Sequence, residues 1–306
     1  MTRVAAIDCG TNSIRLLVAD ADPATGRLTD LDRRMAIVRL GQGVDRTGRL
    51  APEALERTFA ACREYAGVIA GLGAERVRFA ATSASRDADN RADFVRGVVD
   101  ILGVEPEVIT GGQEAEFSFT GATRELSGRF EAPYLVVDIG GGSTEFVLGG
   151  AHVDAARSLD IGCVRLTERH HFSDPPTAAQ LDAARADIAA ALDEAARSVP
   201  LDGAATLVGL AGSVTTLAAI ALDLPAYDPA AVHHSRVPLA RVRELTRRLT
   251  TASQEERAAI PVMHPGRVDV IAAGALILLA VMERTGAREV VASEHDILDG
   301  IALSCV

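Results

Sequence analysis

One motif occurs twice in this chain, and it constrains the fold more than any other feature of the sequence. Residues 8–13 read Asp-Cys-Gly-Thr-Asn-Ser and residues 138–143 read Asp-Ile-Gly-Gly-Gly-Ser, so two copies of D-x-G-x-x-S lie 130 residues apart. In each copy an apolar run precedes the motif and another follows it, which predicts a strand, a turn and a strand. Two such units, each opening one half of the chain, indicate a tandem duplication of one domain, with a cleft between the copies.

Strand-like and helix-like patterns alternate around the two copies, which is typical of an α/β protein. Strands are expected at 3–9, 14–20 and 28–40, and helices at 52–70, 88–101, 177–197 and 266–284. The pattern restarts after Pro133. We therefore expect two domains, residues 1–125 and 126–306, with a terminal helix near 296–304 that could pack back on the first domain.

The composition is that of a folded protein with one large or two ordinary domains. Of its 306 residues, 48% are hydrophobic and 24% charged, which allows a sizeable core and argues against disorder. No apolar run reaches the ~18 residues that a membrane helix needs, and the start MTRVAAIDCG lacks the pattern of a signal peptide. The four cysteines lack CxxC spacing, so the sequence favours a reducing cytoplasm over a disulfide framework or a zinc cluster.

The charges exclude further classes of function. The net charge of −11 argues against nonspecific binding of nucleic acid or of an anionic membrane. All 31 basic residues are arginine, which rules out a Walker A lysine, a kinase-type lysine and a Schiff-base lysine. Aromatic residues make up 4% of the chain and tryptophan is absent, so stacking platforms for single strands are not expected. If the chain handles phosphate, it does so with arginines, backbone N–H groups, hydroxyls and a metal ion.

The repeated motif suits phosphate binding. A turn rich in Gly, Ser and Thr exposes consecutive N–H groups that can surround phosphate oxygens. Gly10 and the three glycines at 140–142 permit close approach and a positive φ. Asp8 and Asp138 end their strands beside these turns, and a carboxylate next to phosphate requires a hard cation such as Mg²⁺ between them. The alternative, two ordinary hairpins with a turn-capping Asp, is disfavoured by the matched duplication.

Three further segments carry weaker signals. Gly212 and Ser213 open a Ser/Thr-rich helix start after a strand, which favours anions but is also a routine cap. Arg86 follows a strand in a small-residue loop, and could clamp phosphate or be an ordinary surface charge. Glu114 lies in the first turn of a helix expected from about Gln113, where acidic residues are common for electrostatic reasons alone.

Six motifs follow one another along the chain: D-x-G-T-N-S-x-R-L-L, ATSxxRxxxN, GGQEAE, DIGGGSTE, GSxTT and GRVDVIAAGALIL. In content and order the chain resembles the exopolyphosphatase/guanosine pentaphosphate phosphohydrolase (Ppx/GppA) family over essentially its whole length. The resemblance implies two duplicated ribonuclease-H-like domains of the actin-like ATPase superfamily, with the active site in the interdomain cleft. It also implies a phosphoric anhydride hydrolase that uses Mg²⁺ or Mn²⁺, and dimerisation is a family-level expectation.

The resemblance also suggests which residues act. The family's catalytic glutamate, which activates water, falls on Glu114 when the chain is aligned through Ala115 and Gly121, although Gln113 stands where many relatives have a second acid. The second-loop acids fall on Asp138 and Glu145, and Asp8 joins Asp138 as a candidate metal ligand. Candidate phosphate-binding residues are Gly10, Thr11, Asn12, Ser13, Arg15, Arg86, Gly140, Gly141, Gly142, Ser143, Gly212 and Ser213.

The chain departs from the family pattern at several points. Cys9 replaces the usual Ile or Met; beside phosphate it could be reactive, but a cysteine on a buried strand is usually inert packing. His233 and His234 stand where relatives often have His-Gly, and a vicinal pair is poor metal geometry, so a loop role is favoured. The segment ASEHDILDGIA differs from the Arg-rich version of many relatives. The chain ends at 306, whereas longer relatives carry additional helical domains, which predicts a preference for short substrates.

Four functions fit these observations. The first is Mg²⁺-dependent removal of the terminal phosphate of inorganic polyphosphate, and the second is hydrolysis of the 5′-terminal phosphate of guanosine pentaphosphate, with guanosine tetraphosphate as a possible inhibitor. The third is an actin-like nucleotide-binding sensor, and the fourth a phosphotransferase to a small acceptor. A glutamate beside a phosphate site favours hydrolysis. No nucleic-acid or membrane partner is expected.

Overall fold

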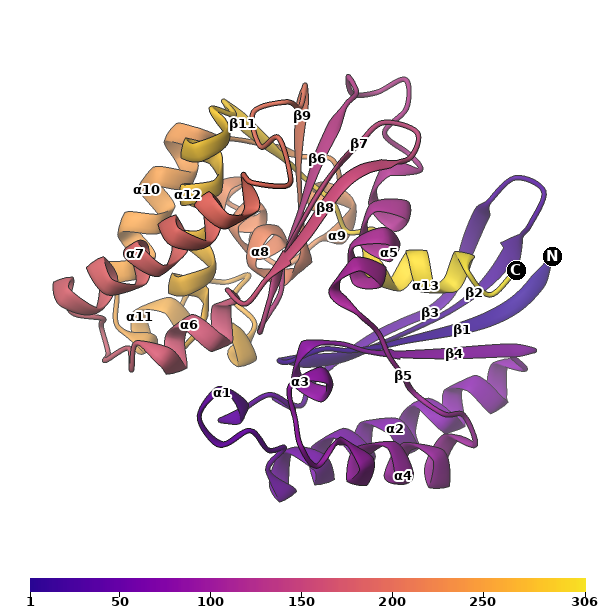
Figure 1. Ribbon diagram of the computed structural model, residues 1–306. Coiled ribbons are helices and arrows are strands. Elements are labelled where there is room, and N and C mark those ends of the chain that lie inside the picture. Colours follow the sequence, from indigo (N-terminus) through magenta and orange to yellow (C-terminus); the bar gives the residue numbers. More distant parts are fainter. The chain divides into compact units, whose positions relative to one another are not determined.

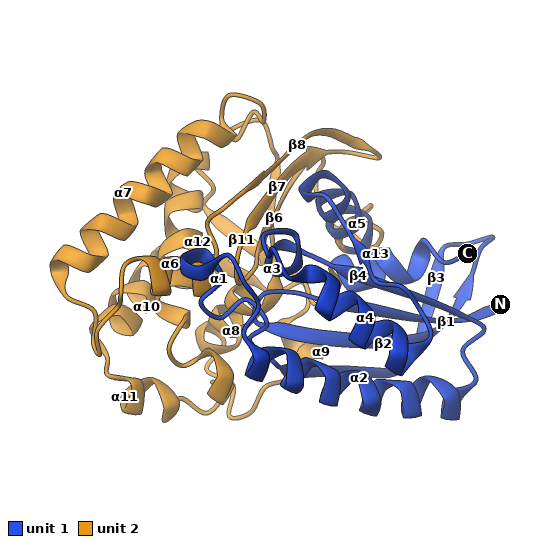
Figure 2. Ribbon diagram, turned by 60° about the horizontal axis from the view of Figure 1, so that its bottom comes forward, with its two compact units in different colours: residues 1–121, 297–306 blue, residues 122–296 orange.

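The computed structural model describes residues 1–306, which divide into two compact units. Unit 1 comprises residues 1–121 and 297–306, and unit 2 comprises residues 122–296 (Figure 2). The division thus falls a few residues before the boundary at 125 that the sequence suggested, and the last ten residues group with unit 1. No helix combines the length and the apolar character needed to cross a membrane.

Unit 1 is built on a five-stranded mixed sheet. Its strands are β1 (Thr2–Cys9), β2 (Ser13–Asp22), β3 (Arg27–Ile37), β4 (Arg76–Ala81) and β5 (Glu107–Val108). They lie in the order β3-β2-β1-β4-β5. Strands β1, β2 and β3 pair antiparallel, whereas β4 and β5 continue the sheet parallel to β1.

Helices cover both faces of this sheet because both faces are apolar. The helices of unit 1 are α1 (Val44–Thr47), α2 (Pro52–Leu72), α3 (Ser83–Arg86), α4 (Arg91–Leu102), α5 (Gly111–Thr123), which reaches the unit boundary, and α13 (Ile297–Leu303). Along β1, Ile7 belongs to the core under α2 and α4, and its neighbour Ala6 to the core under α13. Figure 1 shows α2 and α4 side by side on one face and α13 on the other.

Unit 2 repeats this sheet and adds one edge strand. Its strands are β6 (Tyr134–Ile139), β7 (Thr144–Gly149), β8 (Val153–Leu159), β9 (Thr206–Leu210), β10 (Arg236–Pro238) and β11 (Glu289–Ala292). The order β8-β7-β6-β9-β11 has the same directions as β3-β2-β1-β4-β5, and β10 pairs antiparallel with β11 outside it. The duplicated sheet confirms the predicted class of two ribonuclease-H-like α/β domains.

The helices of unit 2 surround a larger core. They are α6 (Cys163–Arg169), α7 (Ala178–Ala195), α8 (Ala211–Ala221), α9 (Pro229–Val232), α10 (Leu239–Thr251), α11 (Gln254–Ala258), the 3₁₀ turn η1 (Pro265–Arg267) and α12 (Ile271–Thr285). Helix α12 is buried on almost every side, which explains its long apolar run. Thr177 caps α7 through a reciprocal pair with Gln180, at the start of the helix expected at 177–197.

Two local predictions differ from the structure. Arg86 was expected in a loop, but it is the last residue of the one-turn helix α3. The helix expected at 266–284 begins as η1, and regular helix starts only at Ile271. In both places a short turn lies next to a polar motif, and such turns carry no apolar periodicity that would reveal them.

Candidate active site

The two copies of the motif form the same turn. In the first, the N–H of Gly10 donates to the carbonyl of Ser13 at 2.9 Å, and in the second the N–H of Gly140 donates to the carbonyl of Ser143 at 3.0 Å. The flanking strands also share one register: the Asp of each motif lies opposite the residue two positions after the Ser. The sequence repeat therefore corresponds to a repeated backbone structure.

The glycines of these turns let neighbouring backbone atoms approach closely. They do not adopt a left-handed conformation. The sequence permitted a positive φ at Gly10 and Gly140, but neither residue adopts one. A Cβ on Gly140 would lie 3.1 Å from the carbonyl oxygen of Ser143. A Cβ on Gly162 would lie 2.4 Å from the carbonyl oxygen of Gly141, so a glycine outside the motif is also required for the second turn.

Helix α6 orients the peptide groups of the second loop. The loop carbonyls accept hydrogen bonds in three pairs: Gly140 O from Cys163 N (3.0 Å), Gly141 O from Val164 N (2.9 Å) and Gly142 O from Arg165 Nε (2.7 Å). In a trans peptide the N–H points opposite to the carbonyl. The N–H groups of Gly141, Gly142 and Ser143 are therefore expected to point away from α6, and a row of such N–H donors is suited to surround an anion.

The segment after β3 supports the first loop in an equivalent way. The carbonyl of Asn12 accepts hydrogen bonds from the N–H groups of Val38 and Arg39, and the carbonyl of Thr11 accepts one from Gly41. The hydroxyl of Thr11 also lies 2.9 Å from that of Ser83, at the start of α3. The first loop is thus held between residues 38–41 and the helix that carries Arg86.

The two copies differ in the residue opposite the aspartate. In unit 1 this residue is Arg15, whose Nε and Nη2 donate to Asp8 Oδ2 at 3.0 and 2.7 Å. In unit 2 it is Glu145, opposite Asp138. Cross-strand partners project from the same face of a sheet, so two carboxylates lie next to one another there. Both are buried, with 6% of Asp138 and 1% of Glu145 exposed.

Glu114 is distinguished from its neighbours by burial and by an arginine partner. It is 7% exposed, and its Oε2 accepts a hydrogen bond from Arg86 Nη1 at 3.2 Å. Gln113 is exposed and caps α5, since its Oε1 accepts from the N–H of Thr110. Glu116 is exposed as well. Of these three side chains, only Glu114 is held in a fixed and buried position.

Two motifs of unit 2 that lie far apart in the sequence, GSxTT and GRVDV, are in contact. A Cβ on Gly212 would fall 1.8 Å from Arg267 Cζ, so the guanidinium packs directly on this glycine at the start of α8. A Cβ on Gly274 would fall 2.4 Å from Ser213 Oγ. Arg267 was not predicted as a site residue, although its motif GRVDV was recognised. Its contact with Gly212 depends on tertiary structure and has no local sequence signal.

Cys9 is a packing residue in this structure. Its side chain is fully buried in the core under α2 and α4, and burial raises the pKa of its thiol. A thiol that stays protonated is a poor nucleophile. This supports the inert alternative for Cys9.

Comparisons with known proteins show to which family the chain belongs. The model of the Ppx/GppA phosphatase family matches residues 17–306. The chain belongs to the Ppx/GppA phosphatase family. "Exopolyphosphatase 2" of Mycobacterium tuberculosis (strain ATCC 25618 / H37Rv) is 55% identical over 315 residues, covering 99% of this chain and 98% of that protein.

Solved structures of Ppx/GppA proteins superpose on the whole chain. A crystal structure described as an exopolyphosphatase-like protein has a TM-score of 0.94 at 44% identity, covering 99% of this chain and 98% of its own. The Aquifex aeolicus family member has a TM-score of 0.82 at 33% identity, covering 99% and 97%.

The predicted Ppx/GppA site residues divide between the two units. Unit 1 contains the first loop, Arg86 and Glu114, and unit 2 contains the second loop with Asp138 and Glu145. The structure pairs Arg86 with Glu114 and Asp8 with Arg15 in unit 1. It pairs Asp138 with Glu145, and places Gly212 against Arg267, in unit 2.

Proposed function

We propose that this chain is an exopolyphosphatase that releases the terminal phosphate of inorganic polyphosphate by attack of water. The observation that carries the proposal is the duplicated loop, which turns consecutive N–H groups of Gly141, Gly142 and Ser143 to one side without any lysine. The name of the Mycobacterium tuberculosis relative at 55% identity supports polyphosphate as the substrate.

Asp138 and Glu145 are suited to hold a divalent cation. Two buried carboxylates on facing positions of neighbouring strands concentrate negative charge in one place, which favours binding of a divalent cation. Carboxylate oxygens are the ligands that Mg²⁺ and Mn²⁺ prefer. Ser158 donates to Glu145 Oε1 at 2.7 Å and fixes one of its oxygens. A cation held there supplies positive charge to phosphoryl oxygens.

Glu114 is the proposed general base. Its carboxylate can accept a proton from the attacking water, and its hydrogen bond with Arg86 orients it. The N–H groups of the second loop then stabilise the charge that develops on the phosphoryl oxygens in the transition state. Arg15 and Arg267 are further cations for the phosphate chain, each set against one of the phosphate-binding motifs.

The substrate is tested by measuring release of inorganic phosphate from polyphosphate, guanosine pentaphosphate and ATP, each with Mg²⁺ and with a chelator. We expect release from polyphosphate that requires the cation. Release from guanosine pentaphosphate alone would replace the proposal with the second function predicted from sequence. Tight binding of a nucleotide without release from any substrate would support the sensor function instead.

A further inference from the structure

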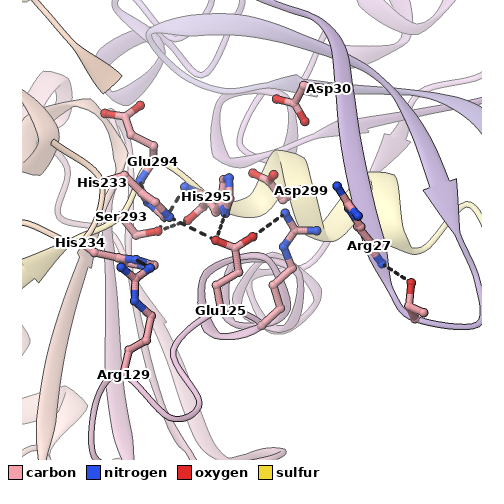
Figure 3. Close-up of polar contacts among 12 residues, drawn as sticks. Arg27, Asp30, Glu125, Arg129, His233, His234, Ser293, Glu294, His295 and Asp299 are labelled. Atoms are coloured by element: carbon pink, nitrogen blue, oxygen red, sulfur yellow. Dashed lines mark hydrogen bonds and ion pairs between the residues drawn. The ribbon is translucent and has the colours of Figure 1, made fainter. Parts of the chain in front are cut away.

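Three side chains of unit 2 meet at a place that the proposed phosphate site does not use. Glu125 follows α5, His233 follows α9 and His295 follows β11. His233 Nε2 lies 3.4 Å from Glu125 Oε2, and His295 Nδ1 lies 3.5 Å from the same oxygen. Figure 3 shows both imidazoles directed at this carboxylate. The three candidate ligand atoms lie within 4.8 Å of one another.

These distances suit a metal better than they suit hydrogen bonds. Metal bonds of ~2.1 Å in a tetrahedral site place two ligand atoms about 3.4 Å apart. Hydrogen bonds from an imidazole are shorter, at 2.7–3.2 Å as a rule. His295 Nδ1 is buried and makes no hydrogen bond, so one nitrogen of the cluster has no partner of the ordinary kind. A buried nitrogen of this kind is normally bonded to an ordered water or an ion, and the carboxylate beside it favours a positive ion.

The neighbours of the cluster orient its ligands. Arg124 Nη2 lies 3.2 Å from Glu125 Oε1, which leaves Oε2 for the two histidines. His234 is turned elsewhere: its φ is 63°, its ring stacks on His233, and its Nδ1 faces Arg129. The objection to a vicinal pair of ligands therefore holds for His234, but His233 acts with residues distant in the sequence.

We propose that Glu125, His233 and His295 form a binding site for a first-row divalent transition metal, with Zn²⁺ as the best match. Two imidazoles and one carboxylate are the ligand set of such ions, and they leave a fourth position open. Mg²⁺ is disfavoured because it prefers oxygen ligands. The site shares no residue with the Asp138–Glu145 pair, and its test does not depend on the proposed hydrolysis.

Binding requires one proton to move within His233. The N–H of Glu294 donates to His233 Nδ1 at 3.1 Å, so the neutral ring carries its proton on Nε2. When a metal takes Nε2, the proton must move to Nδ1, and the hydrogen bond with Glu294 is replaced. The segment 293–295, which links β11 to α13, therefore adjusts when the metal binds.

The test is titration of the metal-stripped, untagged full chain with Zn²⁺ in competition with a chelating dye. We expect one saturable equivalent, and at least ~10-fold weaker binding for Glu125→Gln and for His295→Ala. His152→Ala is the matched control, because His152 is an exposed histidine outside the cluster and its loss should leave the affinity unchanged. Asp138→Asn should also keep wild-type Zn²⁺ affinity, which separates this site from the proposed Mg²⁺ site.

A second measurement uses Co²⁺, whose visible spectrum becomes intense in a four-coordinate site. The wild type and His152→Ala should show this spectrum, and Glu125→Gln should lose it. If His295→Ala does not fold, Glu125→Gln decides the question, since it keeps the size of the side chain and removes only the charge. Absence of stoichiometric binding, or equal Zn²⁺ affinity in the wild type and Glu125→Gln, would overturn the proposal.

Discussion

At the scale of single residues, burial distinguishes between side chains that are chemically alike. Glu114 and Glu116 are carboxylates two positions apart on α5, yet one is buried against Arg86 and the other is exposed. A general base must hold its lone pair in a fixed direction toward water, which an exposed and mobile side chain does poorly. The geometry therefore supports Glu114 as the base.

Glu114→Gln should lower kcat by ~10²–10⁴-fold, because the amide keeps the shape and loses the proton acceptor. Release of inorganic phosphate from polyphosphate measures this loss, while thermal protection by polyphosphate shows that binding persists. Glu116→Gln is the control and should retain wild-type turnover. If the two variants showed the opposite behaviour, the base would be Glu116.

The aspartates of the two loops are also distinguished by their surroundings. Asp8 already accepts two hydrogen bonds from Arg15 on one oxygen, whereas Asp138 faces Glu145. A cation gains most where two negative charges are close together. Both aspartates are candidate ligands by sequence. We therefore expect binding of the divalent cation to depend more strongly on Asp138 than on Asp8.

Asp138→Asn should weaken the apparent Mg²⁺ affinity and lower activity by about 10–100-fold or more. Even the loss of a residue that only hydrogen-bonds to a metal ligand has effects of this size. Asp8→Asn should lower activity by releasing Arg15 but should leave the Mg²⁺ titration in place. The measurement is phosphate release as a function of Mg²⁺ concentration for the wild type and the two variants. An equal shift of the titration in both variants would mean that Asp8 and Asp138 share the ion.

At the scale of elements, the close contact of α13 with α5 supports the helix that carries Glu114. A Cβ on Gly300 would lie 2.0 Å from the backbone carbonyl oxygen of Phe117, so the two helices touch through their backbones. Arg33 donates to both oxygens of the fully buried Asp299 and fastens α13 to β3. Helix α13 is the last element of the chain, but it packs as part of the unit 1 core.

Gly300→Ala should therefore destabilise the protein by about 1–3 kcal/mol, as overpacking does. It should also lower kcat, because α5 must move to admit the methyl group. Urea unfolding and phosphate release measure the two effects. Gly67→Ala is the matched control: Gly67 is exposed on α2, has no atom near the added methyl group, and should gain about 0.5–1 kcal/mol. Wild-type stability of Gly300→Ala would show that the contact is not tight.

At the scale of the whole molecule, charge limits how a polyanionic substrate is held. The net charge is −11, and every basic residue is an arginine. Only local groups of arginines can attract polyphosphate against this background, and their field is screened within ~8–10 Å in physiological salt. The protein should therefore hold a short length of chain firmly and the remainder weakly.

We expect a preference for short polyphosphate and release of the shortened product after few cleavages. Products of long polyphosphate, resolved on a gel at early times under single-encounter conditions, should shift downward as one population. Lower salt should raise the number of cleavages per encounter only modestly, because repulsion by the net charge also grows. Full-length chains together with free phosphate, and no intermediates, would demonstrate processive action and contradict this expectation.

The sequence by itself determined the fold class and the positions of the two repeated loops. The D-x-G-x-x-S repeat is local, and its strand–turn–strand pattern depends on neighbours a few residues away, so both loops and their aspartates could be predicted. The helix expected at 177–197 was predictable for the same reason. In each case the physical cause lies within one turn or one hairpin.

Tertiary structure alone decided which side chains meet across long stretches of chain. The packing of Arg267 on Gly212, of Gly162 on Gly141 and of Gly300 on Phe117 joins segments that are 21 to 183 residues apart, and no periodicity records such contacts. The cluster of Glu125, His233 and His295 is of the same kind. In the sequence, the only candidate metal ligand next to His233 is His234. In the fold, Glu125 and His295 lie beside His233, because β11 and α9 end next to the segment after α5.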